Sequence, residues 1–145
     1  MSGANRSSTL AIYRSLQRIR EHERKSAHQK VVAAEEERDR SVARIEALQE
    51  RVELARTSVD NEDAVSIATY HSYRLQQVIT ERREEARLAQ RNRDLEARRA
   101  HHVVCVREEL SLDAVVERMY ERDQAEERRS DARLMDEIAA RRRYT

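Results

Sequence analysis

The chain has 145 residues, 29 of them basic and 28 acidic, which gives a formal net charge of +1. Charged residues make up 39% of it, and it contains one Gly and no Pro, Trp or Phe. The near-zero net charge leaves no field to hold nucleic acid, and the composition favours long helices or a coiled coil over a globular core. Intrinsic disorder is the competing interpretation, but a disordered chain has no reason to keep apolar residues at helical spacing.

The first predicted helix covers about residues 8–57. Its apolar and small residues recur at spacings of three and four, which indicates one stripe that faces another helix. Glu23 and Arg38 interrupt this stripe with charge. Its other members are Ile12, Leu16, Ile19, Ala27, Val31, Ala34, Val42, Ile45, Leu48, Val52 and Ala55.

A turn is predicted at about residues 58–63. Short polar residues cluster there, and they compete for backbone groups inside a helix but satisfy the exposed amides at a helix start. Asp60, Asn61 or Asp63 is therefore expected to cap the helix that follows. The run resembles calcium-binding sequence in its oxygen content but lacks the length and central Gly of an EF-hand loop.

The second predicted helix covers about residues 64–142, so the fold class is all-α: one domain, an antiparallel coiled-coil hairpin with a longer second helix. A turn near residue 61 should pair positions whose numbers sum to about 122. The apolar stripe of this helix includes Leu95, Val106 and Leu110, and Leu16 then meets Val106. In the same register the two charged interruptions find partners, Glu23 with Arg99 and Arg38 with Glu85.

This register leaves residues from about 113 to 142 without an opposing helix. The apolar residues there recur at spacings that place them along one stripe of the helix. A solitary helix in water gains no stability from such a stripe. We expect them to meet another protein. They are Val116, Met119, Tyr120, Leu134, Met135 and Ile138.

Catalytic and metal-binding patterns are weak throughout the sequence. His101 and Cys105 stand four apart and share a helix face, but two ligands are too few for a metal centre and a lone Cys is ordinarily a small buried hydrophobe. There is no glycine-rich loop to cradle a nucleotide. The sequence therefore predicts no catalytic residues, no metal, no cofactor and no enzyme activity.

The compartment is predicted from hydropathy and cysteine content. No apolar run approaches the length needed to cross a bilayer, and the N-terminal residues lack the hydrophobic stretch of a signal peptide. A single cysteine fits a reducing compartment. A cytoplasmic protein without membrane insertion is expected.

Three segments of the chain, Tyr13–Glu23, Tyr70–Tyr73 and Asp131–Arg141, together resemble one known family. It is the FliJ family of flagellar export proteins, which belong to the central stalks of type III secretion systems. The opening Tyr13-Arg-Ser-Leu-Gln-Arg-Ile-Arg-Glu-His-Glu23 is similar to the family's start. Tyr70-His-Ser-Tyr73 resembles the pair of aromatics that begins its second helix. Asp131-Ala-Arg-Leu-Met-Asp-Glu-Ile-Ala-Ala-Arg141 is similar to its closing segment. The chain departs from the family at Gln77, where an apolar residue is common.

The resemblance implies a stalk that couples a hexameric export ATPase to the cytoplasmic domain of a membrane export gate, with export chaperones as further partners. It places the protein in the cytoplasm, peripherally associated with the membrane export apparatus. Tyr70 and Tyr73 would face the gate. The ATPase-facing end would contain Leu134, Met135, Ile138 and Arg141.

Two other interpretations stay open at the level of sequence. The chain could be a generic coiled-coil scaffold that dimerises through its own helices, or an injectisome counterpart of the flagellar stalk. The basic run at Arg141–Arg143 could complement the dipole of the last helical turn or contact an acidic partner surface.

Overall fold

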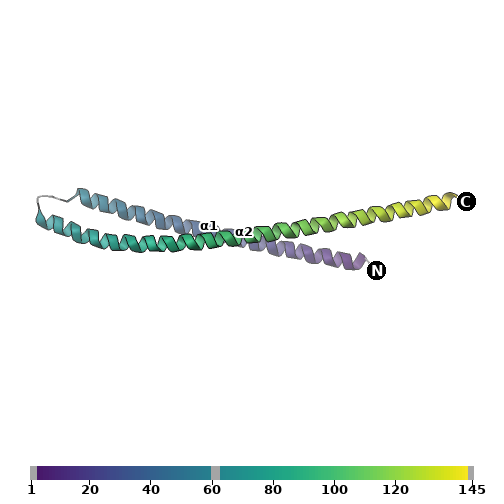
Figure 1. The fold of residues 1–145 in the computed structure, drawn as a ribbon, viewed down its shortest axis with the longest axis horizontal. Coiled ribbons are helices and arrows are strands. Elements are labelled where there is room, and N and C mark those ends of the chain that lie inside the picture. Colours follow the sequence, from purple (N-terminus) through teal and green to yellow (C-terminus); the bar gives the residue numbers. More distant parts are fainter. Residues whose placement is uncertain (1–2, 60–62, 144–145) are drawn as a thin grey trace. The chain divides into compact units, whose positions relative to one another are not determined.

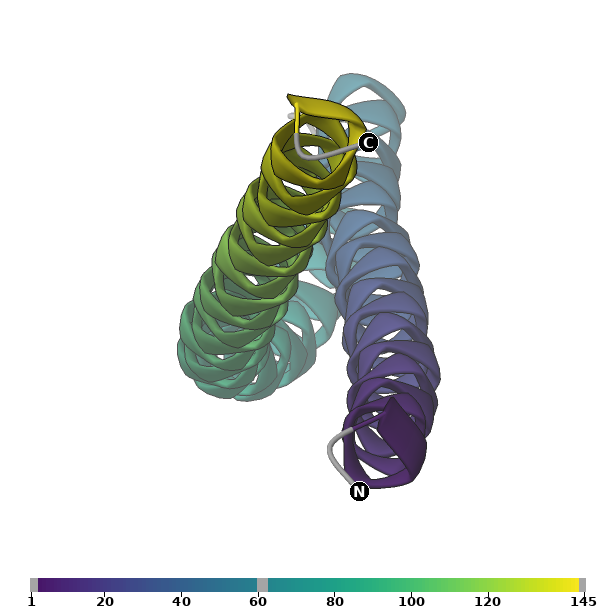
Figure 2. The same cartoon turned by 90° about the vertical axis from the view of Figure 1, so that its right-hand side faces the viewer.

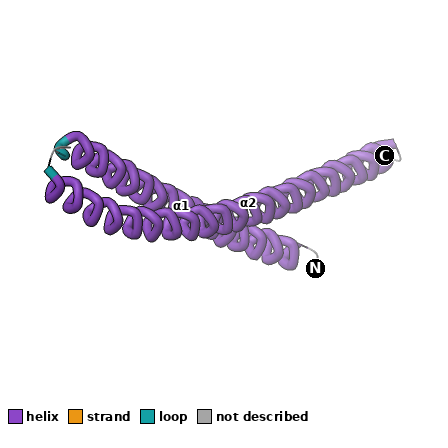
Figure 3. The backbone as a smooth tube through the Cα atoms, turned by 60° about the vertical axis from the view of Figure 1, so that its left-hand side comes forward, coloured by secondary structure: helices purple, strands orange, loops and turns teal. Residues whose placement is uncertain are grey.

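The computed structural model describes residues 3–59 and 63–143 of the chain. Two helices contain nearly all of them, α1 over Gly3–Thr57 and α2 over Ala64–Arg143 (Figure 1). They pack against each other in opposite directions, and Figure 3 shows no strand in the described ranges. The predicted all-α hairpin with a longer second helix is thereby confirmed. α1 begins at Gly3 rather than near residue 8. Residues 3–7 contain no proline, the residue that most strongly interrupts a helix.

Packing contacts divide the chain into two units. We call residues 25–103 the turn unit, because they contain the connection between the helices. Residues 1–24 and 104–145 form the terminal unit, which contains both chain ends. Each unit holds a segment of α1 against a segment of α2, and each is described separately below.

In the turn unit, the covered residues of both helices alternate at spacings of three and four. This is the heptad pattern of a coiled coil, in which such positions form one continuous seam. On α1 the buried or half-buried seam positions are Ala27, Val31, Ala34, Arg38, Ser41, Ile45, Leu48, Val52 and Ala55. On α2 they are Ile67, Tyr70, Arg74, Gln77, Glu81, Glu84, Leu88, Arg91, Leu95 and His102.

The best-buried apolar contact of the turn unit joins Leu95 of α2 to Val31 and Ala34 of α1. Leu95 is only 2% exposed. Burying a leucine side chain to this extent stabilises a fold by about 1.5–3 kcal/mol relative to leaving it in water. All three residues were predicted on the seam, and this part of the prediction is confirmed.

A polar layer crosses the seam of the turn unit at Ser41, which is fully buried. Its hydroxyl donates to the carbonyl of Glu37 at 3.2 Å and accepts a hydrogen bond from Arg91. The same Arg91 group donates to the Glu37 carbonyl at 2.8 Å. Because a buried polar group without a partner is costly, this layer favours one register over its neighbours.

The register of the turn unit differs from the predicted one. Glu35 pairs with Arg99 at 2.7 Å and Gln49 donates to Glu81 at 3.0 Å, so paired numbers sum to 134 and 130 rather than about 122. The predicted partnership of Arg99 with Glu23 is therefore wrong. So is that of Arg38 with Glu85, because Arg38 pairs with its neighbour Asp39 at 2.6 Å.

A stagger at the turn explains the shifted register. Figure 1 shows the first turns of α2 reaching beyond the last turn of α1. The paired sums exceed the predicted one by about 8 to 12, which corresponds to a slide of about 12–18 Å along the helix axis. The prediction had assumed that the two helices begin and end level with each other.

The start of α2 is capped by Asp63, as one of three predicted alternatives. Its carboxylate accepts hydrogen bonds from the backbone amides of Val65 at 3.0 Å and Ser66 at 3.1 Å. An aspartate at this position satisfies two amides that lack helical partners. The other two candidates, Asp60 and Asn61, lie outside the described residues.

In the terminal unit, the α1 side of the seam is polar. The covered positions continue the alternation of fours and threes through Tyr13, Gln17, Arg20 and Arg24. On α2 they are Cys105, Glu109, Leu112, Val116, Met119 and Asp123. The seam predicted here through Ile12, Leu16 and Ile19 is wrong, because all three side chains are exposed.

Ion pairs and hydrogen bonds join the two sides of this polar seam. Arg20 binds Glu108 at 2.7 Å and Arg24 binds Glu109 at 2.5 Å. Gln17 donates to Asp113 at 2.8 Å, and Arg14 donates to the Tyr120 hydroxyl at 2.5 Å. Leu110, which was predicted on the seam, is exposed.

The unpaired part of α2 is shorter than predicted. Val116 is buried, and Tyr120 bonds to Arg14, so α2 is still paired at residues 113–120. Beyond Asp123 every residue through 142 is exposed. Figures 1 and 2 show the last turns of α2 diverging from the first turns of α1. We call residues 124–143 the extension, about 30 Å of single helix.

Candidate interaction surfaces

Exposed apolar side chains gather near the end of the extension. Leu134 is 54% exposed and Met135 68%, and Ile138 is exposed as well. Leu134 and Ile138 are four residues apart and so lie on one side of the helix, with Met135 beside them. Arg141 follows one turn later and is also exposed. Contiguous apolar groups of this kind commonly mark protein interaction sites.

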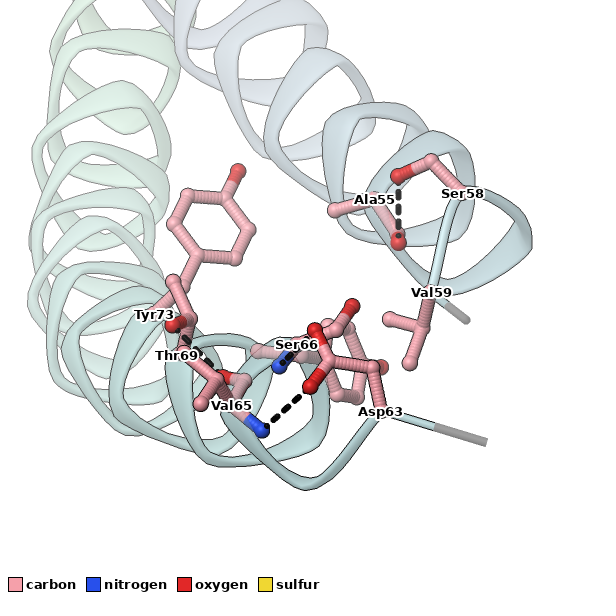
Figure 4. Close-up of a pocket in the computed structure, with 9 residues that line it drawn as sticks. Ala55, Ser58, Val59, Asp63, Val65, Ser66, Thr69 and Tyr73 are labelled. Atoms are coloured by element: carbon pink, nitrogen blue, oxygen red, sulfur yellow. Dashed lines mark hydrogen bonds between the residues drawn. The ribbon is translucent and has the colours of Figure 1, made fainter. Parts of the chain in front are cut away.

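A hollow of about 380 Å³ lies at the turn (Figure 4). α2 contributes Tyr70 and Tyr73, both half-buried, and the end of α1 contributes Ala55. The remaining lining residues are Ser58, Val59, Asp63, Val65, Ser66 and Thr69.

Several polar groups around the hollow are already bound locally. Thr69 donates its hydroxyl to the Val65 carbonyl at 2.8 Å, Ser58 donates to the Ala55 carbonyl at 2.9 Å, and Asp63 caps α2. The aromatic rings are therefore the groups that suit a partner, since a tyrosine offers a large apolar face and a polar tip.

The structure brings the sequence-predicted residues together in two groups. Tyr70 and Tyr73 line one hollow in the turn unit. Leu134, Met135 and Ile138 share the extension with Arg141 in the terminal unit. Which partner either surface meets remains a prediction.

One exposed apolar stripe was not predicted as a surface, because its residues were assigned to the seam. Ile12, Leu16 and Ile19 lie on an exposed flank of α1, one residue before the seam positions Tyr13, Gln17 and Arg20. Strict continuation of the alternating spacing backward from Ala27 would have placed the seam correctly.

Neighbouring carboxylates stabilise the charged form of two arginines at the interface of the helices. The hydrogen bond that Arg20 donates to the Glu23 carboxylate, together with the negative charge of Glu108, raises the pKa of Arg20. The hydrogen bond that Arg99 donates to the Glu35 carboxylate raises the pKa of Arg99. Both guanidinium groups therefore stay charged, and their pairing is insensitive to pH near neutrality.

Metal-binding groups and long apolar stretches were both sought among the described residues. No three of their His, Cys, Asp and Glu side chains gather closely enough to hold a metal ion. Cys105 is buried, whereas His101 is exposed. Within residues 3–59 and 63–143, neither helix has a stretch apolar enough to cross a membrane.

Comparison with known proteins gives no relative. No family model, no curated protein and no solved structure matches this chain.

Proposed function

We propose that this chain is a non-enzymatic stalk of a flagellar or related type III protein export system. In this role it couples a hexameric export ATPase to the cytoplasmic domain of the membrane export gate, and it handles export chaperones. The proposal rests on the resemblance of three segments to the FliJ family and on the two exposed surfaces of the hairpin.

The extension is the observation that carries the proposal. Leu134, Met135 and Ile138 stand exposed on the extension, where every described side chain from 124 to 142 is exposed. Isolated helices gain most of their stability from packing an apolar face. A partner that encloses the helix would bury these three residues, and the pore of a hexameric ring has a suitable shape.

The hollow at the turn supports the second half of the proposal. Tyr70 and Tyr73 line it from one helix, and interfaces are enriched in tyrosine. We assign this surface to the export gate.

The test is binding of the purified chain to the export ATPase encoded in the same genome. We expect Leu134→Ala and Met135→Ala each to weaken binding by about tenfold, since truncating an interface anchor costs about 1–2 kcal/mol. Matched controls are Ile79→Ala, which is 53% exposed, and Leu75→Ala, which is 67% exposed. The ATPase role is wrong if all four variants bind like the original chain, or if the original chain binds no ATPase.

A second candidate function is a scaffold that associates with further copies of itself. The exposed stripe of Ile12, Leu16 and Ile19 favours it, because its spacing of four and three suits packing against another helix. Sedimentation separates the candidates: the stalk is a monomer with a high frictional ratio, and the scaffold is a stable dimer that Leu16→Glu dissociates.

A further inference from the structure

Exposed arginines line one side of the seam in the turn unit. Arg44 and Arg51 on α1 and Arg87 on α2 each stand directly before a seam residue, at heptad position g. In an antiparallel coiled coil the g positions of both helices border the same side of the seam. Arg83 lies one turn before Arg87 on the same face of α2. We call these four exposed residues the arginine flank.

A hollow of about 250 Å³ lies on this flank, between the two helices. Its lining consists of Arg44, Ala47, Leu48 and Arg51 from α1 and of Thr80 and Glu84 from α2. The carboxylate in this lining, that of Glu84, is buried and pairs with Arg87. Its negative charge is therefore balanced within the chain, and the rim of the hollow stays cationic.

The opposite side of the same stretch has a different charge. The matching positions there directly follow seam residues and are neutral or acidic. They are Val42, Gln49, Val78 and Glu85. Positive charge is therefore gathered on one side of the turn unit, although the whole chain has a net charge of only +1. Such a sided pattern suits electrostatic recognition of one partner surface.

We propose that the arginine flank binds an acidic amphipathic helix of a partner protein. Arg44 and Arg51 are seven residues apart, which is about 10 Å along α1. Two carboxylates seven residues apart on an aligned partner helix have the same separation, so both arginines can be paired at once. A small apolar side chain between the carboxylates would fill the hollow over Ala47 and Leu48. The proposal is independent of the export function.

The arginines of the flank have hydrogen-bond donors to spare. Arg44 donates its Nε to the Arg40 carbonyl at 3.2 Å, which uses one of its several N–H groups. Within residues 3–59 and 63–143, Arg51 and Arg83 have no carboxylate partner. A guanidinium group binds a carboxylate through two parallel hydrogen bonds, so these side chains suit Asp or Glu.

Apolar groups beside the arginines favour a protein over a nucleic acid. Ala47 and Leu48 lie between Arg44 and Arg51, and Leu54, seven residues after Ala47, is 64% exposed. The phosphate backbone dominates the affinity of nucleic acids and would leave these apolar side chains unused. An amphipathic helix uses both the charges and the apolar groups.

The test is fluorescence anisotropy of a synthetic helical peptide with the full chain. The peptide has Glu at every seventh position with Ala and Leu between, and its control has Lys in place of Glu. We expect Arg44→Gln and Arg51→Gln each to weaken binding about threefold to fivefold, since each removes one exposed arginine–carboxylate pair. Ala47→Glu should weaken it further, because it places a like charge in the hollow.

Two other arginines serve as matched controls. Arg118 is exposed and donates its Nε to the Ala114 carbonyl at 3.0 Å, as Arg44 does to its own neighbour. Arg82 is exposed beside Arg83 but points to another side of α2. Arg118→Gln and Arg82→Gln should bind the acidic peptide like the original chain. Helical circular dichroism of every variant shows that it is folded.

Three results would overturn the proposal. The first is binding of the acidic peptide no tighter than that of the lysine peptide. The second is an equal loss of affinity in Arg118→Gln and Arg51→Gln. The third is tighter binding of duplex DNA than of the acidic peptide at the same salt concentration, which would make the flank a nucleic-acid surface.

Discussion

Replacing Leu95 by alanine tests the packing of the turn unit. The side chain is 2% exposed and packs against Val31 and Ala34. Leucine-to-alanine changes at buried sites cost about 2–5 kcal/mol, through lost transfer free energy and a residual cavity. Only two helices surround Leu95, so neighbouring side chains and water can partly fill the space. We therefore expect the lower part of that range, about 2–3 kcal/mol.

The assay is urea unfolding followed by helical circular dichroism. Leu75→Ala is the matched control, because Leu75 lies on the same helix and is 67% exposed. The change of residue type is identical, so helix propensity cancels between the two variants. The control should change the free energy of unfolding by no more than about 0.5 kcal/mol. Equal midpoints for Leu95→Ala and Leu75→Ala would refute the assigned packing.

Further predictions concern the register, the cap and the pH dependence. With the native cysteine replaced by alanine, cysteines at Glu35 and Arg99 should be joined within one chain by a short bis-maleimide, whereas cysteines at Leu16 and Val106 should not; the opposite pattern would restore the unstaggered register. Asp63→Ala should lower stability in urea by about 1 kcal/mol through loss of the α2 cap, and Asp63→Asn should retain most of it. Because the Glu35 carboxylate raises the pKa of Arg99, the pair contributes stability wherever that carboxylate is ionised, and on the basic side the contribution is lost only above the ordinary pKa of arginine. The difference in stability between the original chain and Arg99→Gln should therefore stay constant between about pH 7 and pH 10, and a slope across that range would contradict the assignment.

The fold was predictable because local and long-range signals agree in the turn unit. Asp63 lies in the only internal cluster of short polar residues, and it caps α2. Val31, Ala34 and Leu95 were predicted on the seam from apolar spacing alone, and they form the best-buried cluster. Apolar spacing identifies a stripe wherever the seam itself is apolar.

The register was not predictable in the same way. Apolar stripes of similar period match in several registers, and the deciding contacts are polar, as in the pairs of Arg91 with Ser41 and Arg99 with Glu35. In the terminal unit the seam runs through Arg20 and Arg24 while Ile19 is exposed. Hydrophobicity therefore pointed to the wrong side of α1 there.

The candidate surfaces were found from sequence in part. Leu134 and Met135 were predicted as partner-binding residues, and both are exposed on the extension. The contact between the rings of His28 on α1 and His102 on α2, whose centres are 5.4 Å apart, could not be predicted. It depends on a stagger of the helices that no local sequence pattern encodes. Neither the apolar spacing nor the arrangement of the helices specifies which protein binds either surface.

Photocrosslinking in living cells tests the central claim most directly. A photoreactive amino acid replaces Met135 on the extension or, as a control of matched exposure, Leu75 in the turn unit. The stalk account predicts that position 135 captures the hexameric export ATPase and that position 75 does not. Capture of the ATPase equally from both positions, or from neither, would contradict it.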